Sequence, residues 1–317
     1  MLISRCFLPA LCASALLLLL QTHPLKAESA AAYVISDNTT GFLLQSSNPQ
    51  KKLQIGSLTK IATAMVVLDW AEAKGQDLGQ LATVPESAQK LTASEGVGFR
   101  PGDRCSLRDL LYAAMMQSDN QAAETLADHV GRALGTAKPD VTAVNAFVAQ
   151  MNALGRRLGM ERTRFLNPHG LDNLERALPY STAEDLAKLT QYAMSTSAFR
   201  FYVSQKERKI TLQTAAGEQT QYQLRNTNEL VGNHSIDGVK TGTTRKAGPC
   251  LILSAARPPD SKQEGDAHII TPRRLNVVML GAPDRFGLGA QLLDKGWQLY
   301  DSWSAAGRPV KGWPARH

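Results

Sequence analysis

Residues 55–73 read IGSLTKIATAMVVLDWAEA, and this stretch decides the fold. Its apolar side chains recur at the spacing of an α-helix, so we expect residues 57–73 to form a long, largely buried helix. Ser57 stands at the N-terminal end of this helix, and Lys60 follows three positions later. The apolar positions with helical spacing are Ile61, Ala64, Met65, Leu68 and Ala71.

Strand patterns lie on both sides of a helical middle. Apolar runs over 32–36 and 41–45, separated by turn residues, predict a β-hairpin. The strands at the two ends of the chain must meet in one sheet, which predicts an α+β architecture with an inserted all-helical lobe. Helical patterns cover 107–116, 121–130, 141–158 and 182–194, strand patterns cover 209–213, 239–241, 250–256 and 275–280, and a final helix is expected over 289–301.

The N-terminus has the features of an export signal. Arg5 precedes an apolar run, and the small residue Ala27 offers a cleavage point. A transmembrane anchor is the alternative, but the run is shorter than the roughly 20 apolar residues that a spanning helix needs. We therefore expect a signal peptide over 1–27, a single domain over 28–301, and a flexible C-terminal tail over 302–317.

Two further segments contain helix- or strand-breaking residues. In the tail, glycines and prolines interrupt any continuous amphipathic helix, so no stable membrane anchor is expected there. Residues 258–265 are polar and begin with two prolines, which predicts a solvent-exposed loop between two strands.

Composition excludes several classes of protein. The chain has 317 residues, 43% of them hydrophobic and 20% charged, which is ordinary for a globular protein. Loss of residues 1–27 removes Arg5 and Lys26 and no acidic residue, which lowers the formal net charge from +7 to +5. The sequence has no basic block interleaved with aromatic residues, so nucleic-acid binding is not expected.

Cysteine and histidine spacing gives no sign of a metal or redox centre. Cys105 and Cys250 are the two cysteines that remain after the signal, and whether they form a disulfide stays open. Cys250 lies in an apolar run, which favours a buried strand residue. The histidines are scattered without the spacing of metal ligands, so we expect no metal and no cofactor.

Three short motifs point to chemistry. Side chains three apart on a helix share a face, so the Lys60 amine can reach the Ser57 hydroxyl. A desolvated lysine can have its pKa lowered enough to accept the serine proton. Ser57 alone is better interpreted as a helix N-cap, but in combination the motifs predict a catalytic serine with Lys60 as its base. The motifs are Ser57-Leu58-Thr59-Lys60, Ser118-Asp119-Asn120 and Lys240-Thr241-Gly242.

The second motif falls at the junction of two predicted helices, where a short turn can direct two side chains into a cleft. We expect Ser118 to relay a proton to a departing amine. Asn120 carries both a donor and an acceptor and is expected to bind a substrate amide. Capping of the following helix by Ser118 or Asp119 is the structural alternative, and it is compatible with these roles.

The third motif ends a strand. Gly242 allows a substrate backbone to approach and pair with the strand edge. The positive charge of Lys240 is expected to lower the pKa of Lys60 and to attract a carboxylate, which the hydroxyls of Thr241 and Thr243 would bind. The backbone N–H groups of Ser57 and Thr243 would form an oxyanion hole.

With these motifs, the chain resembles the low-molecular-mass penicillin-binding proteins of the D-alanyl-D-alanine carboxypeptidase family. The resemblance covers nearly the whole chain after the signal. It implies a serine β-lactamase/transpeptidase-like fold, with a five-stranded antiparallel sheet and flanking helices. It also includes FRPGD at 99–103, HGLD at 169–172, RNTN at 225–228 and DGVKTGTT at 237–244.

The resemblance also implies an activity and its partners. The expected reaction removes the terminal D-alanine from peptidoglycan stem peptides ending in D-Ala-D-Ala, through an acyl-enzyme. β-Lactam antibiotics would be covalent inhibitors, and the enzyme would act in the periplasm. Many relatives carry an extra C-terminal β-domain and an anchoring helix, and neither is expected here. Arg285 is the one arginine near residues 281–283 that could hold a substrate carboxylate, and we leave it outside the predicted site.

Three other functions compete with this interpretation. The endopeptidases of the family are similarly short, so cleavage of D-Ala to diaminopimelate cross-links stays open. Class A β-lactamases share the three motifs, but they use a glutamate on a loop before the third motif, and residues 165–172 contain none. A non-catalytic wall-binding protein is disfavoured because every expected catalytic position is filled.

Overall fold

The computed structural model describes residues 30–91, 96–135, 141–172 and 177–310. The expected signal peptide and the last residues of the expected tail lie outside these ranges. Within them, no helix combines the length and the apolar character that crossing a bilayer requires.

The central sheet has five antiparallel strands in the order β2-β1-β9-β8-β7. The first and last strands of the chain pair with each other, with Ala32 opposite Leu280, which confirms that the two ends of the chain meet in one sheet. The strands are β1 (Ala32–Asp37), β2 (Leu43–Ser47), β7 (Ile236–Thr244), β8 (Gly248–Glu264) and β9 (Ala267–Leu280).

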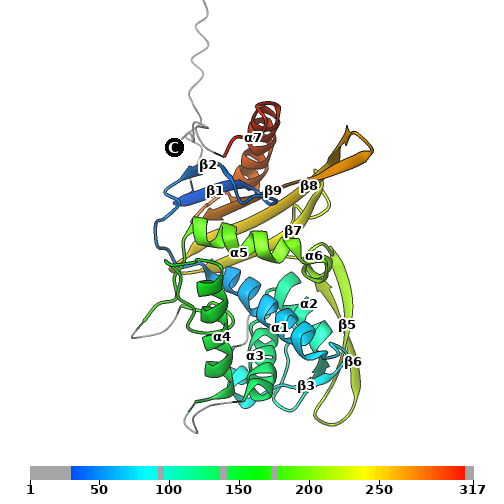
Figure 1. Ribbon diagram of the computed structural model, residues 1–317. Coiled ribbons are helices and arrows are strands. Elements are labelled where there is room, and N and C mark those ends of the chain that lie inside the picture. The colour runs from blue at the N-terminus through cyan, green and yellow to red at the C-terminus, as the bar shows by residue number, and fades with distance from the viewer. Residues whose placement is uncertain (1–29, 92–95, 136–140, 173–176, 311–317) are drawn as a thin grey trace, which may run out of the picture.

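Helices cover both faces of this sheet (Figure 1). Helix α7 (Arg285–Ala305) packs on one face, and α5 (Ala183–Ser195) packs on the other. Along β9, Val277 belongs to the core under α7, whereas its neighbour Val278 belongs to the core that contains α5. This alternation follows from the pleat of a strand, and burial on both faces explains why the strands read as continuous apolar runs.

A lobe inserted between β2 and β7 carries most of the helices (Figure 1). Helix α1 (Lys60–Lys74) lies at its centre and contacts the five α-helices that follow it in the chain. The structure confirms the predicted helices within a few residues, except that a 3₁₀ turn η1 (Gly56–Thr59) precedes α1. The other helices are η2 (Glu86–Leu91), α2 (Leu107–Met116), α3 (Asn120–Leu134), α4 (Ala143–Arg157) and α6 (Ser197–Val203).

Four of these helices begin at a capping side chain. Ser106, Asp119, Thr142 and Thr182 each accept a hydrogen bond from a backbone N–H of the first turn of α2, α3, α4 and α5, respectively. Such a cap satisfies a donor that the helix itself leaves unpaired. The caps therefore set where the lobe's helices start, and Asp119 does so inside the second sequence motif.

The lobe is not all-helical, which corrects the prediction. It also contains a four-stranded sheet in the order β3-β4-β5-β6. Two of its strands have only three residues, too short for an alternating pattern to be recognised. The last is an exposed edge strand with few apolar residues. The strands are β3 (Leu81–Thr83), β4 (Arg104–Ser106), β5 (Glu207–Gln213) and β6 (Gln219–Arg225).

The two cysteines of the described chain lie in different sheets. Cys105 is in β4 and Cys250 is in β8, and both are buried and free. The question that the sequence left open is thus answered by the fold: the two thiols do not form a disulfide.

The predicted loop over 258–265 is wrong for all but its last residue, because residues 258–264 extend β8. They pair with β9 from Asp260 opposite Thr271 to Glu264 opposite Ala267, and the two strands form an arm that projects from the sheet (Figure 1). The two prolines fall where the register shifts between Arg257 and Asp260. A bulge leaves residues outside the ladder, so the missing proline N–H groups cost no hydrogen bond there.

The expected tail also begins later than predicted, because α7 continues to Ala305. Trp303 is completely buried and stacks on Phe42, with ring centroids 4.9 Å apart. Its indole N–H donates to the carbonyl of Pro309 at 3.1 Å, and Arg308 donates to Asp260 at 2.7 Å. The chain is therefore held against the sheet at least to Pro309.

Trp303 should be important for stability. We expect Trp303→Ala to lower the free energy of unfolding by about 3–5 kcal/mol, because it removes a large buried side chain. Urea denaturation followed by circular dichroism measures this change. Val310, whose side chain is 72% exposed, provides the control, and Val310→Ala should change stability by less than about 0.5 kcal/mol. Equal, small effects of both substitutions would show that residues 302–310 do not contribute to the core.

Candidate active site

The candidate nucleophile Ser57 lies in the turn η1, which packs against the end of β7. Glycines on both sides permit the close approach. A Cβ on Gly242 would lie 2.8 Å from the carbonyl oxygen of Ile55, and one on Gly56 would lie 3.2 Å from the Thr243 nitrogen. Gly56 also has a positive φ of 51°, which glycine adopts without strain. The first and third motifs are thereby brought together.

Lys60 is fully buried beneath Ser57. Its Nζ lies 2.9 Å from Ser57 Oγ, 2.7 Å from Asn120 Oδ1 and 2.9 Å from the carbonyl oxygen of His169. Burial lowers the pKa of Lys60 to about 7, opposed by the negative charge of Asp119. The amine is therefore substantially neutral at neutral pH.

The three contacts of Lys60 determine what a neutral amine can do. A neutral amine has two N–H groups and one lone pair. The Asn120 and His169 oxygens can only accept, so they occupy both N–H groups. The lone pair is left facing Ser57 Oγ at 2.9 Å. This arrangement is suited to removing the Ser57 proton.

The second motif forms the turn between α2 and α3. Asp119 is buried and accepts from the N–H groups of Ala122 at 2.8 Å and Val97 at 2.7 Å. Ser118 is held at a positive φ of 63°, a conformation that is uncommon for a residue other than glycine. Such local strain persists only where the surroundings impose it. In the same turn, Asn120 reaches the amine of Lys60 through its Oδ1.

The third motif lies on β7, the edge strand of the central sheet. Lys240 is buried and donates to the carbonyl of Thr241 at 3.0 Å. Burial lowers the pKa of Lys240 well below its ordinary value, with smaller contributions from Lys60 and Arg285. Burial is the main cause of the lowered pKa of Lys60, as the apolar helix predicted, and the expected contribution from the positive charge of Lys240 is not among its causes.

The structure adds Arg285, which lies outside the site that the sequence predicts. Its guanidinium donates to Thr243 Oγ1 at 2.8 Å and to the carbonyl of Gly242 at 3.4 Å. It is the first residue of α7, so the turn after β9 carries it to the end of β7. No sequence spacing indicates this contact, because 42 residues separate Arg285 from Thr243.

The loop over 165–172 closes the other side of the site. The backbone carbonyl of His169 is a partner of Lys60, and Asp172 accepts a hydrogen bond from Thr244 beside the third motif. Burial, with a smaller effect of Lys60, lowers the pKa of His169 to about 3, so its imidazole is neutral at physiological pH. The HGLD motif is visible in the sequence, but His169 contacts Lys60 through its backbone carbonyl, and a side-chain pattern does not predict such a contact.

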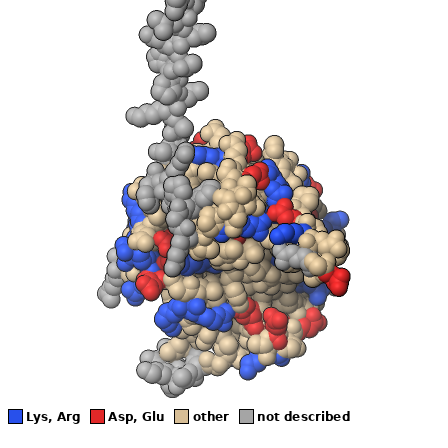
Figure 2. Space-filling model, turned by 45° about the horizontal axis from the view of Figure 1, so that its top comes forward, with Lys and Arg blue, Asp and Glu red and all other residues tan. Residues whose placement is uncertain are grey.

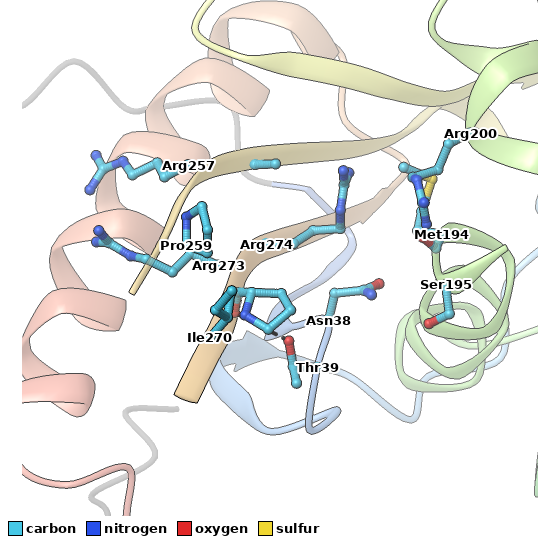
Figure 3. A pocket seen from close by; sticks show the side chains of 12 residues that line it. Asn38, Thr39, Met194, Ser195, Arg200, Arg257, Pro259, Ile270, Arg273 and Arg274 are labelled. Atoms are coloured by element: carbon cyan, nitrogen blue, oxygen red, sulfur yellow. Dashed lines mark hydrogen bonds between the residues drawn. The ribbon is translucent and has the colours of Figure 1, made fainter. Parts of the chain in front are cut away.

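A separate hollow on the described surface lies away from this site. This cavity of about 560 Å³ lies between the β1–β2 turn, the end of α5 and the base of the arm, and is lined by Asn38, Met194, Ile270 and four arginines (Figure 3). Its Arg274 is already paired with Asp237 at 2.6 Å. On the face drawn in Figure 2, basic and acidic side chains are interspersed. None of the sequence-predicted site residues lines this cavity.

Comparison with known families connects this site to proteins of known class. The family model described as D-alanyl-D-alanine carboxypeptidase matches residues 20–261. The carboxypeptidase DacC of Escherichia coli is 30% identical over 292 residues, which cover 89% of this chain. A D-alanyl-D-alanine endopeptidase of Pseudomonas aeruginosa is 35% identical over 237 residues, covering 73% of this chain and 68% of its own. The chain spans 64% of the length of DacC.

Solved structures agree with these relatives. The Streptomyces K15 DD-transpeptidase superposes with a TM-score of 0.72 at 26% identity, covering 85% of this chain and 97% of its own. Penicillin-binding protein D2 from Listeria monocytogenes, solved in an ampicillin-bound form, superposes with a TM-score of 0.65 at 27% identity over 84% of this chain and 97% of its own. The expected serine transpeptidase-like fold class is confirmed.

Gly170 should be indispensable to the packing of the 165–172 loop. A Cβ at Gly170 would lie 1.9 Å from the carbonyl oxygen of Gly56, beside Ser57, and Gly170 has a φ of 87°. Gly159 is a matched control, because its φ is 67° but nothing lies within 4 Å of its Cβ position. We expect Gly159→Ala to cost about 1–2 kcal/mol of stability for its backbone conformation. Gly170→Ala should cost at least about 2 kcal/mol more in urea denaturation, because it adds a steric clash. Equal losses would show that the loop does not pack on the nucleophile turn.

Proposed function

The chain belongs to the D-alanyl-D-alanine carboxypeptidase family, and from this premise we propose that it removes the terminal D-alanine of peptidoglycan stem peptides through a serine acyl-enzyme. One observation carries the proposal. The Ser57 hydroxyl lies 2.9 Å from the amine of Lys60, whose pKa burial lowers to about 7. A serine with such a base beside it is an activated nucleophile.

The proposed acylation assigns a role to each group. Ser57 Oγ attacks the carbonyl carbon of the D-Ala–D-Ala bond while Lys60 accepts its proton. The backbone N–H groups of Ser57 and Thr243 stabilise the oxyanion. Lys60 returns this proton through Ser118 to the leaving amine as the C–N bond breaks. Water then attacks the ester in the same way, which releases the shortened peptide and returns the proton to Ser57.

The proposed substrate lies along β7, whose free edge can pair with a peptide backbone. Asn120 was expected to offer a donor and an acceptor. Its Oδ1 is used by Lys60, so its amide nitrogen is the group that would donate to a substrate carbonyl. Lys240 donates a hydrogen bond to the carbonyl of Thr241 and so helps to fix the backbone of β7 there. Arg285, which is half-buried, supplies the positive charge for the terminal carboxylate.

Cleavage of cross-links is the second candidate, favoured by the 35% identity to the Pseudomonas endopeptidase. Incubation with purified cross-linked and uncross-linked muropeptides, followed by chromatography and mass spectrometry, separates the two activities. Release of D-alanine from uncross-linked pentapeptides supports the carboxypeptidase. Conversion of dimers to monomers without such release would replace it by the endopeptidase. Rapid turnover of penicillin would instead indicate a β-lactamase.

Peptidoglycan lies outside the cytoplasm, so the proposed reaction requires export. We propose that residues 1–27 direct export to the periplasm and are removed there, on the basis of the basic, apolar and small-residue pattern of this segment. Cell fractionation with N-terminal sequencing tests this. An intact Met1 in a salt-resistant membrane pellet would contradict both the cleavage and the absence of a stable membrane anchor.

Ser57→Ala should abolish covalent labelling by a fluorescent penicillin as well as peptide hydrolysis, because no acyl-enzyme can form without the hydroxyl. Labelling is measured in gels and by the mass of the intact protein. Ser302 lies exposed on α7, away from the site, and Ser302→Ala should label like the unmodified chain. Labelling of the Ser57→Ala protein would assign the nucleophile to another residue.

The rate of acylation should depend on pH through Lys60. Only the neutral amine accepts the Ser57 proton, and the pKa of Lys60 is about 7. The second-order rate constant for penicillin acylation should therefore be constant above about pH 8 and fall about tenfold per pH unit below pH 6. Circular dichroism at each pH verifies that the protein stays folded. A rate that does not change between pH 5 and 8 would exclude Lys60 as the base.

A further inference from the structure

Strand β7 carries one extra residue just before the third motif. Ile236 lies opposite Ala255 of β8. The adjacent residue of β8, Ser254, lies opposite Gly238, so the ladder passes over Asp237. This is a β-bulge, which bends a strand and changes the direction of the side chains beyond it. The bulge opens the DGVKTGTT segment and therefore lies directly before the strand residues that belong to the site.

The bulge determines the face of the sheet on which each side chain of the third motif lies. Side chains alternate along a strand, so a shift of one residue reverses every position beyond it. Lys240 lies opposite Ile252, whose side chain belongs to the core that contains α1. Without the bulge, Val239 would take this place opposite Ile252. Lys240 would then lie opposite Leu251, in the core under α7. The extra residue thus keeps Lys240 on the side of α1.

Arg274 of β9 holds this bulge from two strands away. Its guanidinium donates to both carboxylate oxygens of Asp237, at 2.6 and 2.7 Å, and to the hydroxyl of Ser254 at 2.9 Å. Strand β8 lies between β9 and β7, so the contact spans three strands of the sheet. A planar guanidinium that binds both oxygens fixes the orientation of the carboxylate as well as its position.

Two further hydrogen bonds hold the backbone on each side of the bulge. The N–H of Ile236 donates to the carbonyl of Asn233 at 2.8 Å. The side-chain amide of Asn228 donates to the carbonyl of Gly238 at 3.1 Å. Both partners belong to the loop between β6 and β7. This loop fixes the backbone before and after the bulge, whereas Arg274 fixes the bulge residue itself.

We propose that Arg274 is a positioning residue for acylation: it fixes the bulge of β7 and thereby sets the register in which the third motif meets Ser57. This inference rests on the proposed function. Arg274 acts through Asp237 and contacts neither Ser57 nor its base. No sequence spacing indicates the pair, because 37 residues separate Arg274 from Asp237.

The neighbouring residue of β9 provides a matched control. Adjacent side chains of a strand point to opposite faces, and Arg273 accordingly pairs with Asp301 of α7 at 2.8 Å. The two arginines are similarly buried, with side chains 14% and 22% exposed for Arg274 and Arg273, respectively. Arg274→Met and Arg273→Met therefore each remove an ion pair of β9, but only the first removes a contact with β7.

The test measures the second-order rate constant for acylation by benzylpenicillin, from the mass of the intact protein, under conditions where circular dichroism shows each variant folded. Arg274→Met should lower this constant about 10- to 100-fold, because catalytic geometry tolerates only small displacements. Arg273→Met should leave it within about twofold. Arg274→Lys restores the charge but not the planar two-point contact, so it should recover only part of the rate.

Two further measurements show where the change occurs. The inflection of the pH–rate profile should stay near pH 7 in Arg274→Met, because the pKa of Lys60 depends on its own burial and on Asp119. Hydrogen–deuterium exchange followed by mass spectrometry should show faster exchange of the backbone amides of β7 in Arg274→Met. In Arg273→Met the exchange of β7 should be unchanged.

Other results overturn the inference in distinguishable ways. Equal losses of rate in the two methionine variants would assign the effect to general stability. An unchanged rate in Arg274→Met would show that the bulge keeps its place without the arginine, and a shifted pH inflection would place the effect on the base. If the unmodified chain forms no acyl-enzyme, the proposed function fails, and the exchange of β7 still tests whether Arg274 fixes this strand.

Discussion

The burial of one amine organises this protein. Lys60 is completely covered, and its amine reaches three oxygens that belong to distant parts of the chain: Ser57, Asn120 and His169. Removing a charged lysine from water is energetically unfavourable. The pKa of Lys60 is lowered to about 7, so the amine can avoid this cost by losing its proton. The nucleophile turn, the α2–α3 turn and the 165–172 loop must all be in place to satisfy it. The buried amine therefore gains its three hydrogen-bond partners only when the site is assembled.

Close backbone contacts keep these segments in register. Gly56, Gly170 and Gly242 each lie where a Cβ would be too close to a neighbouring backbone. Hydrogen bonds between side chains also link these segments: one joins Thr227 and Thr241, and another joins Thr244 and Asp172. Rigid packing with polar support of this kind holds catalytic groups within the small tolerances that proton transfer needs.

The sequence predicted most of what depends on local pattern. The amphipathic helices, the buried strands and the closeness of Ser57 and Lys60 follow from periodicity and helix spacing, whereas Asn120 was predicted from its motif. The failures have physical causes. Strands of three residues carry no recognisable alternation, and prolines at 258 and 259 indicated a loop although a bulge accommodates them within β8. Arg285 was left out because it reaches Thr243 only through the turn after β9, and His169 takes part through its backbone.

The pairing of β1 with β9 has a consequence for how the chain acquires its structure. Because Ala32 pairs with Leu280, the central sheet cannot close until the chain has been synthesised as far as residue 280. Contacts of such long sequence separation slow folding, because the loop entropy is lost before the contact is gained. They also keep a partial chain from folding to completion on its own. A chain that ends before β9 therefore lacks the strand that joins the β1–β2 hairpin to β8 and β7.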